Sequence, residues 1–243
     1  VIKIGTSTLS KNGGVNTAYI HSVAQQIAEL ENAGKKAVLI TSGAIGMGAG
    51  QLKITEAVTT IQMRQACAAV GQPLLMSEYR KAFGKFGLIC AQVLLTAEVL
   101  NNRKTYLNLK NSIETLLKLG VIPVLNENDC VATDEIGTAF GDNDKLSALV
   151  ASKLDADALI ILSDIDGLYD KNPKEFEDAR LVKVVYEITP EILKSAGSKG
   201  STFSTGGMKT KIEAAKIASN AGCRIVLANG KIKNVITRII AGE

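Results

Sequence analysis

The chain has 243 residues, of which 46% are hydrophobic and 21% charged, enough to build one large core or two lobes. Its net charge of +4 is spread along the chain and only 4% of its residues are aromatic, so the composition does not indicate nucleic-acid binding. Four cysteines without CxxC spacing and one histidine argue against a zinc site, and no apolar run approaches the ~20 residues that span a bilayer. We therefore expect a cytoplasmic protein that binds neither membranes nor nucleic acid.

Residues 1–5, VIKIG, predict a first strand with a lysine at its centre. A buried lysine is costly unless it meets an anion, so Lys3 either faces an anionic ligand or lies in water on an edge strand. Asn16 and Thr17 predict the start of a helix, which should end before Gly34 and carry His21 on its polar side. Its apolar residues recur at helical spacing at Ile20, Val23, Ala24, Ile27 and Leu30.

Residues 37–40 predict a second buried strand, followed by the glycine-rich stretch 41–50, whose backbone N–H groups could approach a ligand closely. The stretch is not a dinucleotide fingerprint, since position 51 is Gln, and the chain contains no GxxxxGK[ST] motif. Residues 55–83 predict a long helix with a break near 71–73. Its many small residues indicate close packing on a neighbour or on another subunit, the latter in a homodimer or homotetramer.

Residues 88–95 predict a third strand, and residues 103–119 predict an amphipathic helix whose inner side carries Leu107, Ile113, Leu116 and Leu117. The apolar run 121–125 predicts a strand buried on both faces.

Two polar clusters flank the short segment after that strand, which itself suits a small hairpin at 130–140. Asn126–Asp129 follows the strand directly, and Gly141–Asp144 precedes a helix whose free N–H groups favour anions. Taken singly, the first cluster fits a solvated turn and Asp142 fits a helix cap. Together, at the carboxyl end of one strand, they favour a ligand site.

Residues 158–162 predict a further strand, and 163–170 form either a turn or a loop at the edge of a nucleotide; their spacing is wrong for a calcium loop. The Gly/Ser-rich segment 197–208 should order on ligand binding and opens a helix. Lysines in the first turns of that helix oppose its dipole, which an anion such as phosphate would offset. Residues 224–228 and 235–240 predict two last strands. The alternation predicts a single α/β domain, a three-layer αβα sandwich with a largely parallel central sheet.

Six motifs in this order make the chain resemble the glutamate 5-kinases of the amino acid kinase family: Lys3–Ser7, Thr41–Ala44, Asn126–Asp129, Gly141–Asp144, Ser163–Tyr169 and Thr205–Met208. The resemblance covers essentially the whole chain and implies a carbamate kinase-like fold. It implies transfer of the ATP γ-phosphoryl group to the side-chain carboxylate of L-glutamate, the first step of proline biosynthesis. It also implies ATP as co-substrate, Mg²⁺ held mainly by the nucleotide without a protein metal site, and feedback inhibition by proline.

The resemblance further implies an amino-acid-binding lobe at about 1–150 and an ATP-binding lobe at about 151–243, in a form expected to lack the C-terminal PUA domain of many relatives. The catalytic residues it implies are Lys3, Gly5, Gly43, Asp144 and Lys211. Those for glutamate are Ser42, Gly43, Ala44, Asp129 and Asn143. Those for ATP are Lys3, Ser163, Asp164, Thr205, Gly206, Gly207, Met208, Lys209, Thr210 and Lys211. Ser163 is a mild departure, because the family often has threonine there.

The residues support this chemistry independently of the resemblance. Phosphoryl transfer depends mainly on positioning and charge neutralisation, and an acceptor carboxylate is already ionised at pH 7, so no general base is required. Asp129 is our hypothesis for binding the glutamate α-ammonium group. Acetylglutamate, aspartate, carbamate and uridylate kinases share the fold and remain alternatives, as does a sensor of nucleotides or amino acids that does not turn over.

Overall fold

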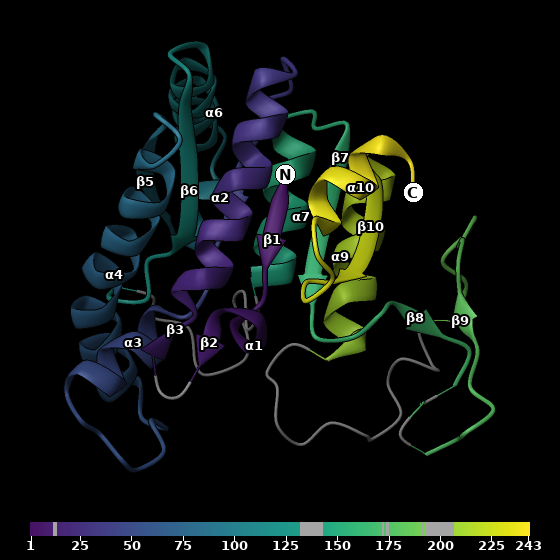
Figure 1. Cartoon of the computed structure of the whole chain (residues 1–243), viewed down its shortest axis with the longest axis horizontal. Helices are drawn as coiled ribbons and strands as arrows, with labels where there is room; N and C mark the ends of the chain where they lie inside the picture. Colours follow the sequence, from purple (N-terminus) through teal and green to yellow (C-terminus); the bar gives the residue numbers. More distant parts are fainter. Residues whose placement is uncertain (12–13, 132–142, 172, 174, 191, 193–206) are drawn as a thin grey trace.

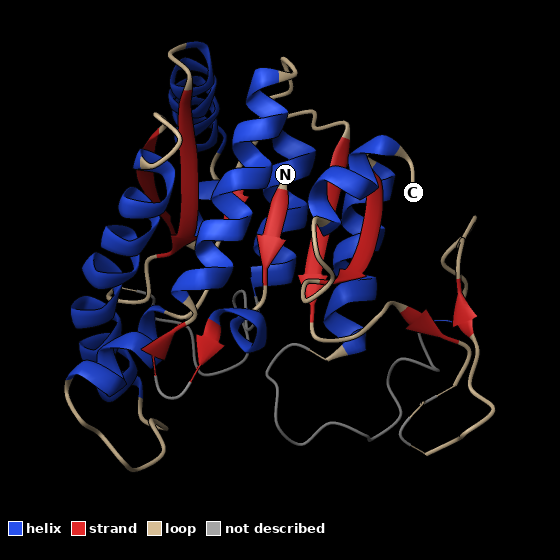
Figure 2. Cartoon of the chain, viewed as in Figure 1, coloured by secondary structure: helices blue, strands red, loops and turns tan. Residues whose placement is uncertain are grey.

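A six-stranded parallel sheet runs through the molecule (Figures 1 and 2). The computed structural model describes residues 1–243 except 12–13, 132–142, 172, 174, 191 and 193–206. In spatial order the strands are β10 (Arg224–Asn229), β7 (Ala158–Ser163), β1 (Ile2–Ile4), β4 (Leu39–Ile40), β6 (Val121–Glu127) and β5 (Ile89–Leu95). Every neighbouring pair is parallel, which confirms the predicted sheet.

Strand β1 lies between β4 and β7, inside the sheet. The chain adds β4, β5 and β6 on one side of β1 and then returns to add β7 and β10 on the other side. The strand order therefore reverses at β1, and open α/β sheets bind ligands at such a point, beyond the carboxyl ends of the strands. This position removes the alternative that Lys3 lies in water on an edge strand.

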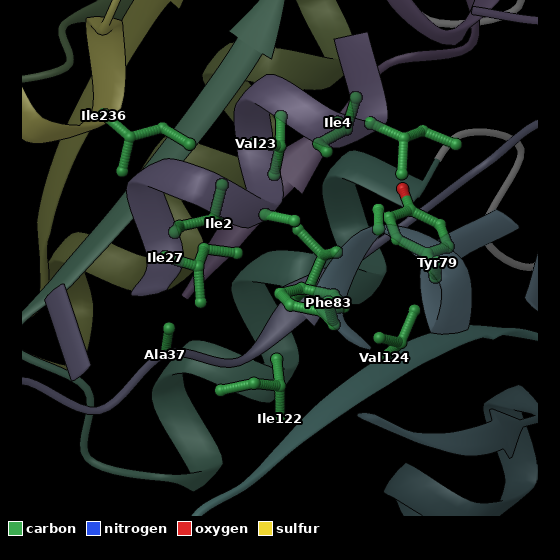
Figure 3. Close-up of a cluster of buried hydrophobic side chains, with 14 of the residues drawn as sticks. Ile2, Ile4, Val23, Ile27, Ala37, Tyr79, Phe83, Ile122, Val124 and Ile236 are labelled. Atoms are coloured by element: carbon green, nitrogen blue, oxygen red, sulfur yellow. The ribbon is translucent and has the colours of Figure 1, made fainter. Parts of the chain in front are cut away.

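Helices cover both faces of the sheet, as predicted for a three-layer sandwich (Figure 2). Ile2 and Ile4 point into the larger core cluster, shown in Figure 3, beneath α2 (Thr17–Asn32), α4 (Ile61–Gly84) and α10 (Val235–Ala241). The opposite face is covered by α6 (Arg103–Lys118), α7 (Asn143–Lys153) and α9 (Met208–Asn220). Because successive strand residues face opposite sides, Lys3 points toward this second layer.

Several short elements complete the described chain: α1 (Thr6–Leu9), β2 (Ser10–Lys11), β3 (Gly14–Val15), α3 (Ala44–Gln51), α5 (Ala97–Asn101), β8 (Leu168–Tyr169) and β9 (Leu181–Val182). Strands β2 and β3 pair antiparallel, as do β8 and β9, which stand apart from the main sheet beyond β10 (Figure 1). Within the described part of the chain, no helix combines the length and the apolar character needed to cross a membrane.

The predicted long helix differs from α4 in two respects. It begins at Ile61, where the Thr60 side chain accepts a hydrogen bond from the Met63 N–H (3.3 Å), and not near residue 55. It also runs without a break through Pro73. A proline inside a helix removes one backbone hydrogen bond. Burial of Cys67 and Ala68 before it and of Leu75, Tyr79 and Phe83 after it holds both halves against the sheet and α3.

The glycines at 46–50 lie in helix α3, and not in an open loop. Gly43 begins the helix in the left-handed region at φ +95°, a conformation that favours glycine. A Cβ on Gly48 would lie 1.8 Å from the Cys67 carbonyl oxygen, and one on Gly71 would lie 1.8 Å from that of Ala44. Gly48 and Gly71 therefore permit close packing of α3 on α4. The sequence analysis did not assign this role to these two glycines.

Residues 235–240, predicted as a strand, form helix α10. Their β-branched and apolar composition favours a strand locally. In the structure Val235 and Ile236 are buried against the face that α2 covers, and the Gln26 side chain of α2 accepts a hydrogen bond from the Ile236 N–H at 2.8 Å. Tertiary packing and this cap therefore decide the helical conformation.

Two helices begin and end close to the predicted residues, with small differences in which side chains they bury. Helix α2 begins at Thr17, after Asn16 accepts a hydrogen bond from the Tyr19 N–H, and ends before Gly34. In α6, Ile113 is fully buried, but Leu107 is 41% exposed, so its assignment to the inner side was wrong. His21 is only partly exposed and packs on the Phe86 ring at 5.2 Å.

Candidate active site

A buried carboxylate joins two lysines from opposite ends of the chain. Lys3 Nζ lies 2.6 Å from Asp144 Oδ1, and Lys211 Nζ lies 3.0 Å from Asp144 Oδ2. Lys3 is 2% exposed, Lys211 7% and Asp144 0%. The two ammonium groups are therefore held by one side chain beside the sheet.

The positions of these side chains follow from the elements that carry them. Lys3 lies in β1, the strand at which the strand order reverses, and Asp144 lies in the first turn of α7. Lys211 shares the inner face of α9 with Ala214 and Ala218, at helical spacing. Alanines of α7 and α9 share one core cluster, and their small side chains allow the close approach that lets Lys211 reach Asp144.

Hydrogen bonds from α9 and within α7 hold Asp144 in place. The Thr210 hydroxyl lies 3.2 Å from Asp144 Oδ2 and 2.8 Å from the Gly207 carbonyl oxygen. The Ser147 hydroxyl donates to the Asp144 carbonyl oxygen at 2.6 Å. Thr210, which the resemblance assigns to ATP, therefore also contacts the carboxylate that joins the lysines.

The charges of this cluster suit a phosphate ligand. Two ammonium groups lie together with one carboxylate in a place shielded from water. Ammonium groups form charge-assisted hydrogen bonds with phosphate oxygens, so both lysines could contact the same anion. Gly5 lies beside this cluster, because a Cβ there would come 3.8 Å from Lys3 Nζ.

A second, uncharged cluster lies at the ends of β4 and β6. Asn143 Nδ2 lies 2.6 Å from the Thr41 carbonyl oxygen, 3.0 Å from Ser42 Oγ and 2.9 Å from Asn126 Oδ1. Asn143 directly precedes Asp144, so the start of α7 contributes to both clusters. The structure thus brings together Ser42 and Asn143, both assigned to glutamate. Gly43 and Ala44 continue from Ser42 into α3.

Three residues of this uncharged cluster were not among the predicted site residues. Asn126 Nδ2 donates to Gln72 Oε1 at 2.9 Å, and Gln72 Nε2 donates to Gln92 Oε1 at 3.1 Å. Asn126 belongs to the polar cluster already recognised in the sequence. No local sequence pattern marks Gln72 and Gln92 as site residues, because a glutamine in a helix or an edge strand is usually an ordinary surface residue.

Asp129 lies near the carboxyl end of β6, one residue after Asn128, whose N–H donates to the Leu95 carbonyl oxygen at 2.7 Å. Burial raises the pKa of the Asp129 carboxyl, and the positive charge of Arg64 partly opposes this shift. A carboxylate in such a place gains from a cationic partner. No hydrogen bond joins Asp129 to Ser42 or Asn143 in the described part of the chain.

The predicted nucleotide residues are placed in part. Ser163 ends β7, and its hydroxyl donates to Asp164 Oδ1 at 3.1 Å. Gly207 precedes α9 with an extended backbone, followed by Met208 and by Lys209, whose Nζ lies 4.0 Å from Glu213 Oε1. Thr205, Gly206 and most of the segment 197–208 lie outside the described residues. So do the hairpin predicted at 130–140, apart from its first two residues, and Gly141 and Asp142.

Side chains of the Ser163–Tyr169 motif continue this edge together with Asn229, which the sequence analysis did not single out. Asn229, at the end of β10, donates to Asp166 Oδ1 at 2.9 Å, and the Tyr169 hydroxyl lies 3.3 Å from Asp166 Oδ2. The Gly230 N–H donates to the Ser163 carbonyl oxygen at 2.8 Å. Because β7 and β10 are paired in register, Asn229 lies opposite Ser163 at the sheet edge, a neighbour relationship that no local motif indicates.

A Mg²⁺ ion finds no set of ligands in the described part of the chain, where no three His, Cys, Asp or Glu side chains are grouped to hold a metal. Both oxygens of Asp144 already face lysine ammonium groups.

Comparison with known proteins agrees with this geometry. The family model described as "Amino acid kinase family" matches residues 1–229. Among curated proteins, the glutamate 5-kinase of Methanosarcina acetivorans is 52% identical over all of this chain and 65% of its own length. That of Caldanaerobacter subterraneus is also 52% identical, over 65% of its length. That of Clostridium perfringens is 49% identical over all of this chain and 91% of its own length. The chain thus spans slightly under two thirds of the first two relatives.

Solved structures with low sequence identity share the fold. The structure described as "Crystal structure of T. acidophilum isopentenyl phosphate kinase product complex" superposes with a TM-score of 0.64 at 17% identity, over 98% of this chain and 94% of that one. A second structure of isopentenyl phosphate kinase gives the same TM-score at 19% identity. At this identity the match shows the fold alone.

Proposed function

We propose that this chain, which belongs to the amino acid kinase family, transfers the γ-phosphoryl group of ATP to the side-chain carboxylate of L-glutamate. The product is L-glutamyl 5-phosphate, which makes the reaction the first step of proline biosynthesis. The observation that carries the proposal is the buried cluster in which Asp144 holds both Lys3 and Lys211. The glutamate 5-kinases, about half of whose residues are identical to this chain, support glutamate as the acceptor.

In the proposed reaction the two lysines contact phosphate oxygens on either side of the transferred group. Charge spreads over the equatorial oxygens in the transition state, so fixed cations stabilise it without moving. Asp144 cannot act on the phosphate directly, because its oxygens face the ammonium groups. Its role is to hold Lys3 and Lys211 at a fixed separation, with Gly5 allowing the nucleotide to approach the first of them.

The acceptor is an ionised carboxylate at pH 7, so it attacks without losing a proton. This agrees with a site whose described residues include no histidine, since His21 lies in α2 against Phe86. Catalysis then depends on alignment of the acceptor with the γ-phosphorus, which is the role of groups that hold glutamate firmly.

For the acceptor we propose a binding site formed by Ser42, Gly43, Ala44, Asp129 and Asn143. Ala44 is buried, so its backbone N–H, in the first turn of α3, is the group it offers. Burial raises the pKa of the Asp129 carboxyl, which means that a cation near it is favoured, and we assign it to the α-ammonium group.

For the nucleotide we propose Ser163, Asp164 and the segment Thr205–Lys211, beside the ends of β7 and α9. This division places the acceptor in residues of about 1–150 and ATP in residues of about 151–243. Mg²⁺ would accompany the phosphates of ATP, whose oxygens would be its main ligands, and would neutralise part of their charge. A cytoplasmic homo-oligomer and inhibition by proline complete the proposal, as expected from the resemblance.

The test is an assay of ADP release with glutamate, acetylglutamate, aspartate, carbamate and UMP offered in turn as acceptors. Turnover with glutamate at least ten times faster than with any other acceptor is the expected result. Preference for another acceptor would assign the chain to a different kinase of the same family. Binding of ATP and glutamate without ADP release would instead support a sensor.

A further inference from the structure

Four side-chain amides form a directed chain between the sheet edge and the start of α7. It runs from Gln92 of β5 through Gln72 of α4 and Asn126 of β6 to Asn143 of α7, with donor–acceptor distances of 3.1, 2.9 and 2.9 Å. Its inner links are shielded from water, because Gln72 is 7% exposed and Asn126 2%. We propose that Gln72 is a positioning residue, which fixes the direction of this amide chain and thereby the way Asn143 faces the acceptor.

One backbone carbonyl shows which way the amide chain is directed. The Thr41 carbonyl oxygen can only accept, so the Asn143 atom 2.6 Å from it must be the donor Nδ2. The Asn126 atom facing that nitrogen must then be its oxygen, and its nitrogen must face an acceptor. Gln72 Oε1 is that acceptor. If Gln72 presented a donor instead, Asn126 would face it with an unpaired N–H or would turn over.

The direction decides what Asn143 offers to a ligand. Its Nδ2 hydrogens are shared among Thr41 O, Ser42 Oγ and Asn126 Oδ1, so its own Oδ1, which lies in the same amide plane, faces away from these three acceptors. Within the described part of the chain, no donor contacts that oxygen. It is an acceptor available to a donor such as an ammonium group. If Asn126 turned over, Asn143 would meet a donor and lose this orientation.

The position of Gln72 is set by the packing of its neighbours. The preceding residue is Gly71, where any Cβ would collide with the Ala44 carbonyl oxygen. The α4 backbone therefore lies directly against the start of α3. Leu75 and Tyr79, one and two turns further on, are completely buried beneath the sheet. Gln72 is thus held firmly enough for its amide to act as a fixed acceptor.

This inference rests on the proposed function, because it needs an acceptor that carries an ammonium group. The test compares three variants: Gln72→Met, which removes both polar groups, Gln72→Glu, which when ionised can only accept, and Gln72→Lys, which can only donate. We expect Gln72→Met to raise the KM for glutamate about tenfold, since a buried N–H loses its partner, while the KM for ATP stays within about twofold. Gln72→Glu should disturb glutamate binding less than Gln72→Lys.

That order separates amide direction from simple charge. Glutamate carries a net negative charge, so electrostatics alone predicts tighter binding to the lysine variant and weaker binding to the glutamate variant. A Gln72→Lys enzyme that binds glutamate as well as Gln72→Glu does, or better, would overturn the inference. So would a folded Gln72→Met enzyme with the wild-type KM. If Gln72→Met does not fold, the two charged variants decide.

Gln26→Met is the matched control, because Gln26 is equally buried but its side chain bonds to α2 and α10, away from the site. It should lower thermal stability and leave the glutamate KM unchanged. A rise equal to that of Gln72→Met would refute a specific role for Gln72. Wild-type enzyme without glutamate-dependent turnover would refute the proposed function instead, and the variants would then be compared with the acceptor that the wild type uses.

Discussion

The charged cluster and the amide chain are both buried and polar, and they meet at neighbouring residues, Asp144 and Asn143, yet they differ in kind. The charged cluster joins two ammonium groups to one carboxylate and has no inherent direction, because any ammonium group can pair with any carboxylate oxygen. The amide chain is neutral, and each link has a donor end and an acceptor end. The charged cluster therefore suits a phosphoryl group that moves from one molecule to another. The amide chain suits a substrate that must be bound in one orientation.

Removing the carboxylate should produce the largest effect. Asp144→Ala removes the buried carboxylate that pairs with both Lys3 and Lys211, so we expect the free energy of unfolding to fall by about 3–5 kcal/mol and turnover to be lost. Urea denaturation measures the first effect. Asp155→Ala is the control, since that carboxylate pairs with Lys110 at the surface and should contribute under about 1 kcal/mol. Equal losses in the two variants would contradict the distinction.

Removing one lysine should reduce the rate more than the affinity. In Lys211→Ala we expect kcat to fall roughly 10²-fold or more, because its contact with the phosphate strengthens in the transition state. Steady-state kinetics with saturating glutamate and ATP would measure this. Lys216→Ala, an exposed lysine of the same helix, serves as the control. Near-normal turnover of Lys211→Ala would show that the charged cluster does not act on the transferred group.

Removing the Asp129 carboxylate should weaken the binding of glutamate more than that of ATP. Asp129→Ala should raise the KM for glutamate about tenfold, with a smaller change for ATP, because an ammonium group would lose a charged partner. Acceptor titrations at fixed ATP would measure it. The opposite pattern, with the ATP affinity weakened and the glutamate KM intact, would remove the assignment of Asp129 to the acceptor.

The smallest expected effect is a dependence of the protein's stability on pH, measured in the absence of ligand. Burial raises the pKa of the Asp129 carboxyl in the folded protein, so between its ordinary and raised values the folded state binds more protons than the unfolded state. The stability of the wild type relative to Asp129→Asn should therefore be highest at low pH and decline as pH rises through that window. Denaturation series from pH 3.5 to 7 would measure the difference. A difference that grows with pH would mean that the folded site stabilises the ionised carboxylate.

Much of the fold could be predicted from local patterns. Residues 88–95, 121–125 and 158–162 form strands because continuous apolar runs of that length fit a buried parallel sheet, and Asn16 begins α2 because its side chain caps the first turn. Local patterns failed where two structures suited the same residues. The segment 235–240 had strand composition, and Gly48 resembled part of a ligand loop, but the structure places both in helices that pack on α2 and α4.

The sequence by itself determined the identity of the chemical groups: the two lysines, the Asn143–Asp144 pair and the serine after β4, each in a motif whose order indicated phosphoryl transfer. It could not determine which groups meet, since Lys3 fitted an edge strand in water as well as a buried site. Only the tertiary structure placed β1 at the switch point and joined Lys3 to Lys211 through Asp144. Only it brought Gln72 to Asn126, because contacts between residues distant in the chain arise from packing and leave no local pattern.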